Sequence, residues 1–145
     1  RVVVIEAEDF SAEGQGTCQK RDDRQAISGQ IITYWHQDVG HWLEWEIDVP
    51  MDGRYAMRLR YASGSENPRR SLFVDGKTPF EQAEDIAFES TGGFGQQAAE
   101  WRWRHLVDEH GVERTLQLDS GKHTIRMVNL TDGLALDMLV LVRQP

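Results

Sequence analysis

Apolar and polar residues alternate along most of this chain with a period of two, which is the spacing of a β-strand that buries one face. The clearest case is residues 41–49, in which apolar side chains alternate with acidic ones from Leu43 onward. Residues 54–61 alternate in the same way, with arginines on the polar face. The turn-forming residues 50–53 separate the two stretches, and the pattern therefore predicts a β-hairpin.

In such a hairpin, the register that pairs Glu46 with Arg58 also pairs Glu44 with Arg60. Opposite charges then face each other on the solvent side, which stabilises an antiparallel pair. The sequence therefore predicts that these two strands are hydrogen-bonded neighbours.

Further short stretches with strand character are separated by clusters of Gly, Ser, Thr, Asp and Asn. They are residues 30–35, 70–75, 84–89, 100–107, 113–118, 122–129 and 136–142. Residues 11–19 fit no pattern, and no helical period runs longer than a turn or two. About eight to ten short antiparallel strands predict an all-β fold, a β-sandwich or jelly roll. A chain of 145 residues is expected to form a single domain, residues 1–145.

The two ends of the chain each carry acids within an apolar stretch. Glu6 and Glu8 project from the same face if residues 2–9 form a strand, because side chains alternate. Asp137 lies in the last apolar stretch, and strands placed side by side would bring it to the two glutamates. Such a cage of hard oxygens is the ligand set that Ca²⁺ prefers. The alternative is that the glutamates lie on a solvated strand face and Asp137 lies in a turn.

Aromatic residues gather at two places in the pattern. Tyr34 and Trp35 end one predicted strand and lead into His36, and Trp101 and Trp103 share one face of another. Small-ligand sites are mostly apolar and aromatic with a few polar groups, and flat aromatic faces stack on the C–H faces of sugar rings. These side chains therefore predict a ligand platform, with core packing as the alternative for each tryptophan.

Composition narrows the classes of partner. The net charge of −8 argues against nucleic acid, and no apolar run approaches the ~18 residues that a membrane span needs. The lone Cys18 rules out an internal disulfide and a cysteine-based zinc site. The motifs of serine hydrolases, zinc proteases and nucleotide-binding folds are missing. The 24 acidic residues do not single out a catalytic pair.

Several segments, taken together and in order, resemble the carbohydrate-binding modules of families 6 and 35, the small β-sandwiches appended to secreted polysaccharide-degrading enzymes. They are residues 5–10, 28–30 leading into Tyr34, 40–45, 53–55, 58–62, 74–77, 91–94, 121–126 and 136–141. The resemblance covers nearly the whole chain. The chain also begins at Arg1 without an initiator Met or signal peptide, as expected of a processed protein or a module cut from a larger one.

The resemblance implies a structural calcium. In these families the paired acids of the first strand and the acid of the last strand bind it, which maps to Glu6, Glu8 and Asp137. A backbone carbonyl from the segment before Ser28 completes the set, and Arg24 is the candidate here.

The resemblance also implies a sugar site in the edge loops, where two aromatic rings clasp a sugar. Tyr34 fits the first position, and Trp101 or Trp103 is expected at the second. These modules often place a sugar-binding Asn two residues before the last-strand acid, where this chain has Ala135, and Asn129 is the candidate substitute. Trp35 and His36 are expected to contribute to the same pocket.

The expected function is that of a non-catalytic module that holds a fused, secreted enzyme of bacterial multimodular type close to its polysaccharide. One alternative is a small β-sandwich hydrolase or lyase that uses carboxylates such as Asp38 or Glu100. The other is a structural or protein-interaction domain, in which the exposed aromatics have no sugar to hold.

Overall fold

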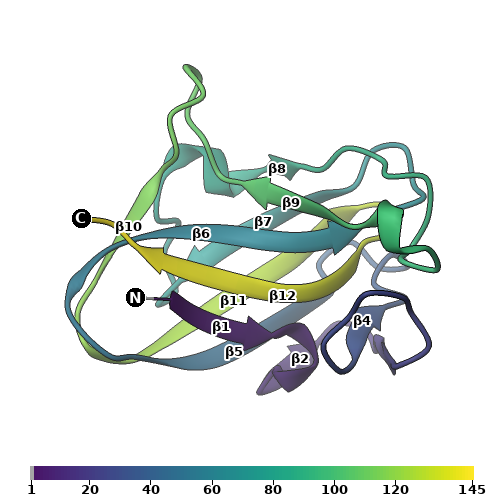
Figure 1. Cartoon of the computed structure of the whole chain (residues 1–145), viewed down its shortest axis with the longest axis horizontal. Coiled ribbons are helices and arrows are strands. Elements are labelled where there is room, and N and C mark those ends of the chain that lie inside the picture. The colour runs from purple at the N-terminus through teal and green to yellow at the C-terminus, as the bar shows by residue number, and fades with distance from the viewer. Residues whose placement is uncertain (1) are drawn as a thin grey trace.

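Two antiparallel β-sheets pack face to face in the computed structural model, which describes residues 2–145 (Figure 1). The elements are β1 (Val2–Glu6), η1 (Ala7–Asp9), β2 (Ala12–Gly14), β3 (Gln19–Arg21), β4 (Ile31–Thr33), β5 (Trp42–Val49), β6 (Gly53–Ala62), β7 (Arg69–Val74), η2 (Glu81–Glu84), β8 (Ile86–Ala87), η3 (Ala98–Glu100), β9 (Arg102–His105), β10 (Thr115–Leu118), β11 (Gly121–Thr131) and β12 (Ala135–Arg143), where η marks a 3₁₀ helix. The predicted all-β sandwich is confirmed.

The first sheet has the strand order β10-β6-β12-β4-β3, with β1 paired to β12 and β9 paired to β6. The second sheet has the order β2-β5-β11-β7-β8. The described residues form twelve strands rather than the expected eight to ten, because β2 and β3 arise around a segment whose pattern predicts nothing. None of the helices in residues 2–145 is long and apolar enough to cross a membrane.

The predicted hairpin between β5 and β6 is wrong. The two strands lie in different sheets, and β5 pairs with β2 and β11 whereas β6 pairs with β9, β10 and β12. Glu44 therefore pairs with Arg126, at 3.0 Å between Oε1 and Nε, instead of with Arg60. Alternation fixes which face of a strand is buried, but it leaves the hydrogen-bonding neighbour open. Here the apolar faces of β5 and β6 are both buried in the core between the two sheets, and the chain crosses between sheets at residues 50–52.

Several other predicted strands are shorter in the structure, among them residues 30–35 and 113–118, which form only β4 and β10. The first strand ends at Glu6, and Glu8 follows on the 3₁₀ helix η1. Residues 84–89 form only the two-residue β8, after η2, and residues 100–107 form only the four-residue β9.

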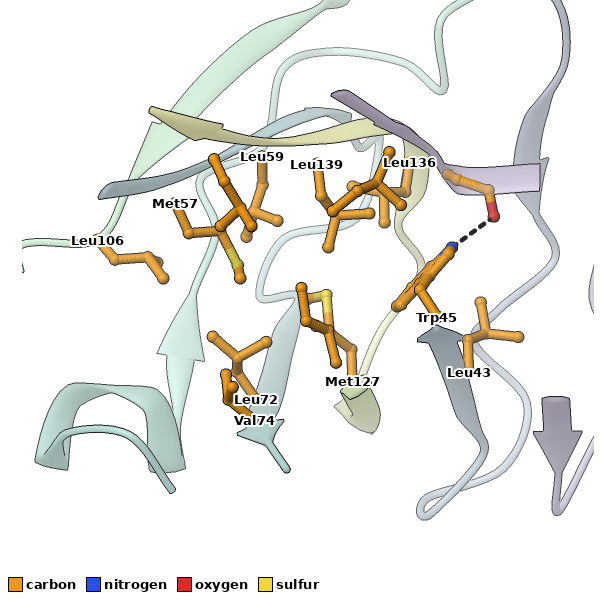
Figure 2. Close-up of a cluster of buried hydrophobic side chains, with 14 of the residues drawn as sticks. Leu43, Trp45, Met57, Leu59, Leu72, Val74, Leu106, Met127, Leu136 and Leu139 are labelled. Carbon is orange, nitrogen blue, oxygen red and sulfur yellow. Dashed lines mark hydrogen bonds between the residues drawn. The ribbon is translucent and has the colours of Figure 1, made fainter. Parts of the chain in front are cut away.

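The core lies between the two sheets, where side chains from both interleave (Figure 2). Leu43 and Trp45 of β5 face Leu136 and Leu139 of β12, and these side chains are fully buried. The Trp45 indole N–H donates a 2.9 Å hydrogen bond to the carbonyl of Ala7 on η1. A bond of this kind contributes about 0.5–1.5 kcal/mol, and here it fixes the turn that carries Glu8.

Candidate functional site

The two ends of the chain lie side by side, and their acids come near one another. Strand β1 pairs with β12 so that Glu6 lies opposite Met138, which is the neighbour of Asp137. Asp137 is fully buried, and Glu8 is brought to it by η1 rather than by a continued strand. We call Glu6, Glu8 and Asp137 the acid cluster.

Two carboxylate oxygens of the acid cluster lack partners. Asp137 accepts a 2.6 Å hydrogen bond from Arg60 at Oδ2, but its Oδ1 is buried and unpaired among the described residues. Glu8 accepts the N–H of Gln30 at Oε2, at 3.0 Å, and its Oε1 is likewise buried and unpaired. Buried polar atoms without partners are costly, and a bound cation is one way to satisfy them.

Electrostatic coupling also links the acid cluster. Burial raises the pKa of Glu6, and repulsion from Glu8 and Asp137 raises it further. The hydrogen bond from Ser28 acts in the opposite direction but does not cancel the rise. Burial raises the pKa of Asp137 as well, although Arg60 opposes this. Glu6 and Asp137 therefore sense the negative charge of neighbouring carboxylates, and a cation between them would lower the pKa of both.

The acid cluster is not drawn together into a closed cage. Among residues 2–145, no group of three or more His, Cys, Asp or Glu side chains is close enough to hold a metal ion. The guanidinium of Arg60 bridges Asp137 and the carbonyl of Ala26, at 2.6 Å to each. The carbonyl of Ala26 therefore lies beside Asp137, while the side chain of Arg24, the candidate from the sequence, donates Nε to the carbonyl of Phe94 at 3.1 Å. The unpaired oxygens of Glu8 and Asp137 are hard ligands of the kind that Ca²⁺ prefers.

A pocket of about 390 Å³ opens among the loops. We call it the loop pocket, and it is lined by Arg24, Thr33, Tyr34, His36, Ser65, Phe94, Gln96, Asp132, Gly133 and Leu134. Tyr34 directly follows β4, is 46% exposed and has a φ of 58°. Asp132 also has a left-handed backbone, with a φ of 62°. Such conformations are uncommon for non-glycine residues and gather at ligand sites, where the surrounding structure holds them in place.

Two expected sugar-binding residues are buried behind the loop pocket. Trp35 is fully buried and donates its indole N–H to the carbonyl of His41, at 3.0 Å. Asn129 is also fully buried and donates its side-chain N–H to the carbonyl of Asp38, at 2.9 Å. Both therefore support the loop of residues 34–41, while His36 reaches the pocket itself.

The two candidate tryptophans lie apart from Tyr34. Trp101 is buried, and its indole N–H donates to the carbonyl of Gln25, at 2.9 Å. Trp103 is 47% exposed and lines a separate recess along β9. Besides the imidazole of His36, the aromatic ring that shares the loop pocket with Tyr34 is Phe94. The sequence offered a signal for it, because Phe94 directly follows the Thr91-Gly92-Gly93 segment behind which the second aromatic was expected.

Neither of the carboxylates considered for a hydrolase, Asp38 and Glu100, is among the described residues that line the loop pocket. Glu100 accepts the backbone N–H groups of Gly95 and Gln97, at 3.1 and 3.2 Å, and so shapes the loop that carries Phe94. Among the described residues that line the loop pocket, Asp132 is the single acid, and its Oδ2 accepts the N–H of Asn67. The usual glycosidases place two carboxyl groups on either side of the scissile bond, and this pocket offers one.

No family model matches the chain. A curated relative, a 3-O-α-D-galactosyl-α-L-arabinofuranosidase of Bifidobacterium longum subsp. longum, is 28% identical over 137 residues. The match covers 89% of this chain and spans only 11% of the length of that enzyme.

Solved carbohydrate-binding modules share the fold over nearly the whole chain. A family 35 module from Clostridium thermocellum is 24% identical with a TM-score of 0.75, and 99% of each chain is covered. A family 6 module of lichenase 5A from Cellvibrio mixtus, solved with cellotriose, is 22% identical with a TM-score of 0.71. That match covers 99% of this chain and 98% of the module. The expected resemblance to families 6 and 35 is thus confirmed, and at these identities it establishes the fold.

Proposed function

We propose that this chain is a non-catalytic carbohydrate-binding module that holds a sugar in the loop pocket. The observation that carries the proposal is the pairing of Tyr34 and Phe94 in one open pocket, with polar groups of Gln96 and Asp132 beside them. Aromatic faces take the apolar faces of a sugar ring, and the amide and carboxylate groups take its hydroxyls. The left-handed backbone at Tyr34 holds this ring outward in advance of binding, which lowers the ordering cost.

The acid cluster supports a structural calcium in the same proposal. Glu8 and Asp137 would supply their unpaired oxygens, with Glu6 and the carbonyl of Ala26 close to them. When bound, the ion would neutralise the repulsion between the carboxylates. Its role is to hold β1 and η1 against β12, so it acts on stability.

The biological role that we infer is targeting. The chain spans a small part of the Bifidobacterium longum enzyme that it resembles, which favours a module within a secreted, multimodular enzyme. Binding to a polysaccharide would raise the effective concentration of the attached catalytic domain at its substrate. The galactosyl and arabinosyl units in the name of that relative make glycans that contain these sugars the first ligands to test.

The test is a glycan array followed by calorimetry on the 145-residue chain, with calcium and with a chelator. We expect Tyr34→Ala to lower the affinity for the bound glycan by more than about tenfold, because the stacking surface is lost. Val39→Ala is the matched control, since Val39 is 75% exposed on the neighbouring loop and lies outside the loop pocket.

Two results would contradict the proposal. A folded, calcium-loaded chain that binds no glycan would point to a structural or protein-interaction domain. Release of new reducing ends from a polysaccharide by the chain alone would point to the hydrolase or lyase instead.

A further inference from the structure

A second recess, of about 470 Å³, runs along the free edge of β9. We call it the β9 groove, and it is lined by Tyr61, Ala87, Glu89, Ser90, Arg102, Trp103, Arg104 and His105. Strand β9 pairs with β6 on one side, and Figure 1 shows β8 close to its other side. Side-chain contacts span the gap, since Arg104 donates Nε to the carbonyl of Ala87 at 2.8 Å.

Both faces of β9 contribute side chains to the β9 groove. Trp103 and His105 lie opposite Arg60 and Arg58 of β6, on the outer face of the sheet, whereas Arg102 and Arg104 point to the other side. Because the β9 groove runs along a strand edge, side chains from both faces of β9 line it. The ring of Trp103 is 47% exposed, which leaves a large apolar face open to solvent.

The β9 groove carries positive charge in a chain whose net charge is −8. Arg102 donates Nη1 to the carbonyl of Ala99 at 2.7 Å, and Arg104 donates to the carbonyls of Ala87 and His105. Within residues 2–145, neither guanidinium forms a salt bridge. Their remaining N–H groups suit a bidentate anion.

Within residues 2–145, few free carboxylates lie near the β9 groove to repel such an anion. Glu89 is exposed, its charge acts on Arg104, and it is the one carboxylate among the described lining residues. Glu113 is already paired with Arg58, at 3.0 Å, and with His105, at 3.3 Å. Burial lowers the pKa of Arg104, so a bound anion would relieve the cost of holding its charge.

We propose that the β9 groove is a second carbohydrate site, for a negatively charged sugar. Trp103 stacks on the face of the sugar ring, and Arg102 and Arg104 bind its carboxylate or sulfate group. The inference rests on the proposed function only in that both sites take glycans, because the two sites share no residue. A polyanionic glycan bound here and a second chain segment in the loop pocket would together raise the avidity of the module.

The experiment is isothermal titration calorimetry of the 145-residue chain with trigalacturonic acid, with a sulfated galactan tetrasaccharide and with a neutral galactotriose. We expect at least one of the charged sugars to bind at the β9 groove, and the pair distinguishes a carboxylate from a sulfate ligand. Raising the salt from about 0.02 M to about 0.5 M weakens this binding, because the charges are partly exposed. Neutral galactotriose does not occupy the β9 groove.

Single substitutions then locate the site. Arg102→Gln and Trp103→Ala each lower the affinity for the charged sugar by about tenfold or more. The first removes a charge-assisted contact, and the second removes the stacking face. Lys122→Gln is the matched control, because it removes the same charge from a side chain that is 72% exposed on the other sheet. Tyr34→Ala leaves the affinity for the charged sugar unchanged. Thermal unfolding of each variant verifies the fold.

Three outcomes would overturn the proposal. They are failure of both charged sugars to bind, an equal loss in Lys122→Gln, and loss of charged-sugar binding in Tyr34→Ala. The last outcome would place the charged sugar in the loop pocket and leave the proposed function standing. If a charged sugar were instead the sole ligand found, with binding that depends on Trp103, the site in the β9 groove would be supported. That result would contradict the proposal that Tyr34 binds a sugar in the loop pocket.

Discussion

The acid cluster and the loop pocket are assembled by different parts of the fold. The acid cluster rests on the pairing of β1 with β12, a continuous five-residue register between the two ends of the chain. The loop pocket is built mainly from three loop segments, around Tyr34, Phe94 and Asp132, to which Arg24 and Ser65 add single side chains. The one register pair between β4 and β12, Ile32 with Leu136, connects two of these segments. A site on paired strands depends on sheet register, whereas a site on loops depends on individual polar contacts. Single substitutions should therefore separate the two sites.

Arg70 is the contact on which the loop pocket depends most. Its buried guanidinium donates to the carbonyls of Trp35 and Asp132, at 2.6 and 3.1 Å, and to those of Arg69 and Thr131. It also stacks 4.2 Å from the centre of the Trp35 ring. Burial lowers the pKa of Arg70 to about 9, which shows how costly its position is. One side chain thus fixes both loops whose left-handed residues line the pocket.

The largest expected effect comes from Arg70→Met. The substitution leaves buried carbonyls without a donor, so we expect the free energy of unfolding to fall by about 3 kcal/mol or more. Sugar binding in the loop pocket is lost in the same variant, while calcium still stabilises the folded chain. Urea unfolding and calorimetry measure the two effects.

The neighbouring Arg69→Met provides the control for Arg70→Met. Arg69 forms a partly exposed pair with Asp85, at 2.6 Å, and such pairs contribute about 1 kcal/mol or less. Equal destabilisation by the two substitutions would contradict the role given to Arg70.

The second prediction concerns the acid cluster and its dependence on pH. Burial raises the pKa of Glu6 and of Asp137, so without calcium the folded state loses stability as the pH rises through these raised values. Calcium removes that cost, and it must displace protons at low pH. We therefore expect calcium at 100 times its Kd to stabilise the chain by about 2.7 kcal/mol at pH 7, and by much less at pH 4. Thermal unfolding with calcium and with a chelator at both pH values measures this.

Asp137→Asn tests whether calcium binds at the acid cluster. It removes a charged ligand, so the stabilisation by calcium at pH 7 should disappear, whereas Asp85→Asn, at an exposed position, should retain it. A calcium effect that persists unchanged in Asp137→Asn would place the ion elsewhere. The loop pocket should keep its sugar affinity in Asp137→Asn if the fold is intact, because the two sites are held independently.

The sequence was sufficient for the features that depend on local pattern. Alternation located most of the strands and the sandwich, and the acids at the two ends predicted the approach of Glu6 to Asp137. It did not identify the neighbours of β5 and β6, because a strand that buries one face does so equally well in either sheet. Arg60 illustrates the consequence, since its partner is Asp137 of β12, which is 77 positions away in the chain.

The loop pocket was harder to predict for a related reason. Alternation has no meaning in loops, so the exposed Tyr34 and the buried Trp35, which are adjacent in sequence, could not be told apart. Their difference arises from the left-handed φ at Tyr34 and from Arg70, which holds the carbonyl of Trp35 from another sheet. The sequence also led to Trp101 and Trp103 as candidates for the second ring, although Trp101 is buried and Trp103 lines a different recess.

The smallest expected effect comes from Phe94→Ala, which tests whether Phe94 or Trp103 contacts the neutral sugar. Phe94→Ala should lower the affinity for the sugar in the loop pocket by about tenfold, equivalent to about 1.4 kcal/mol, because one of two stacking faces is lost. Trp103→Ala removes a larger and more exposed ring from the β9 groove and should leave that affinity unchanged. Calorimetry with the same neutral glycan compares the two. If Trp103→Ala caused the greater loss, the neutral sugar would lie along β9, and the expectation from the sequence that Trp103 binds it would replace the assignment of Phe94.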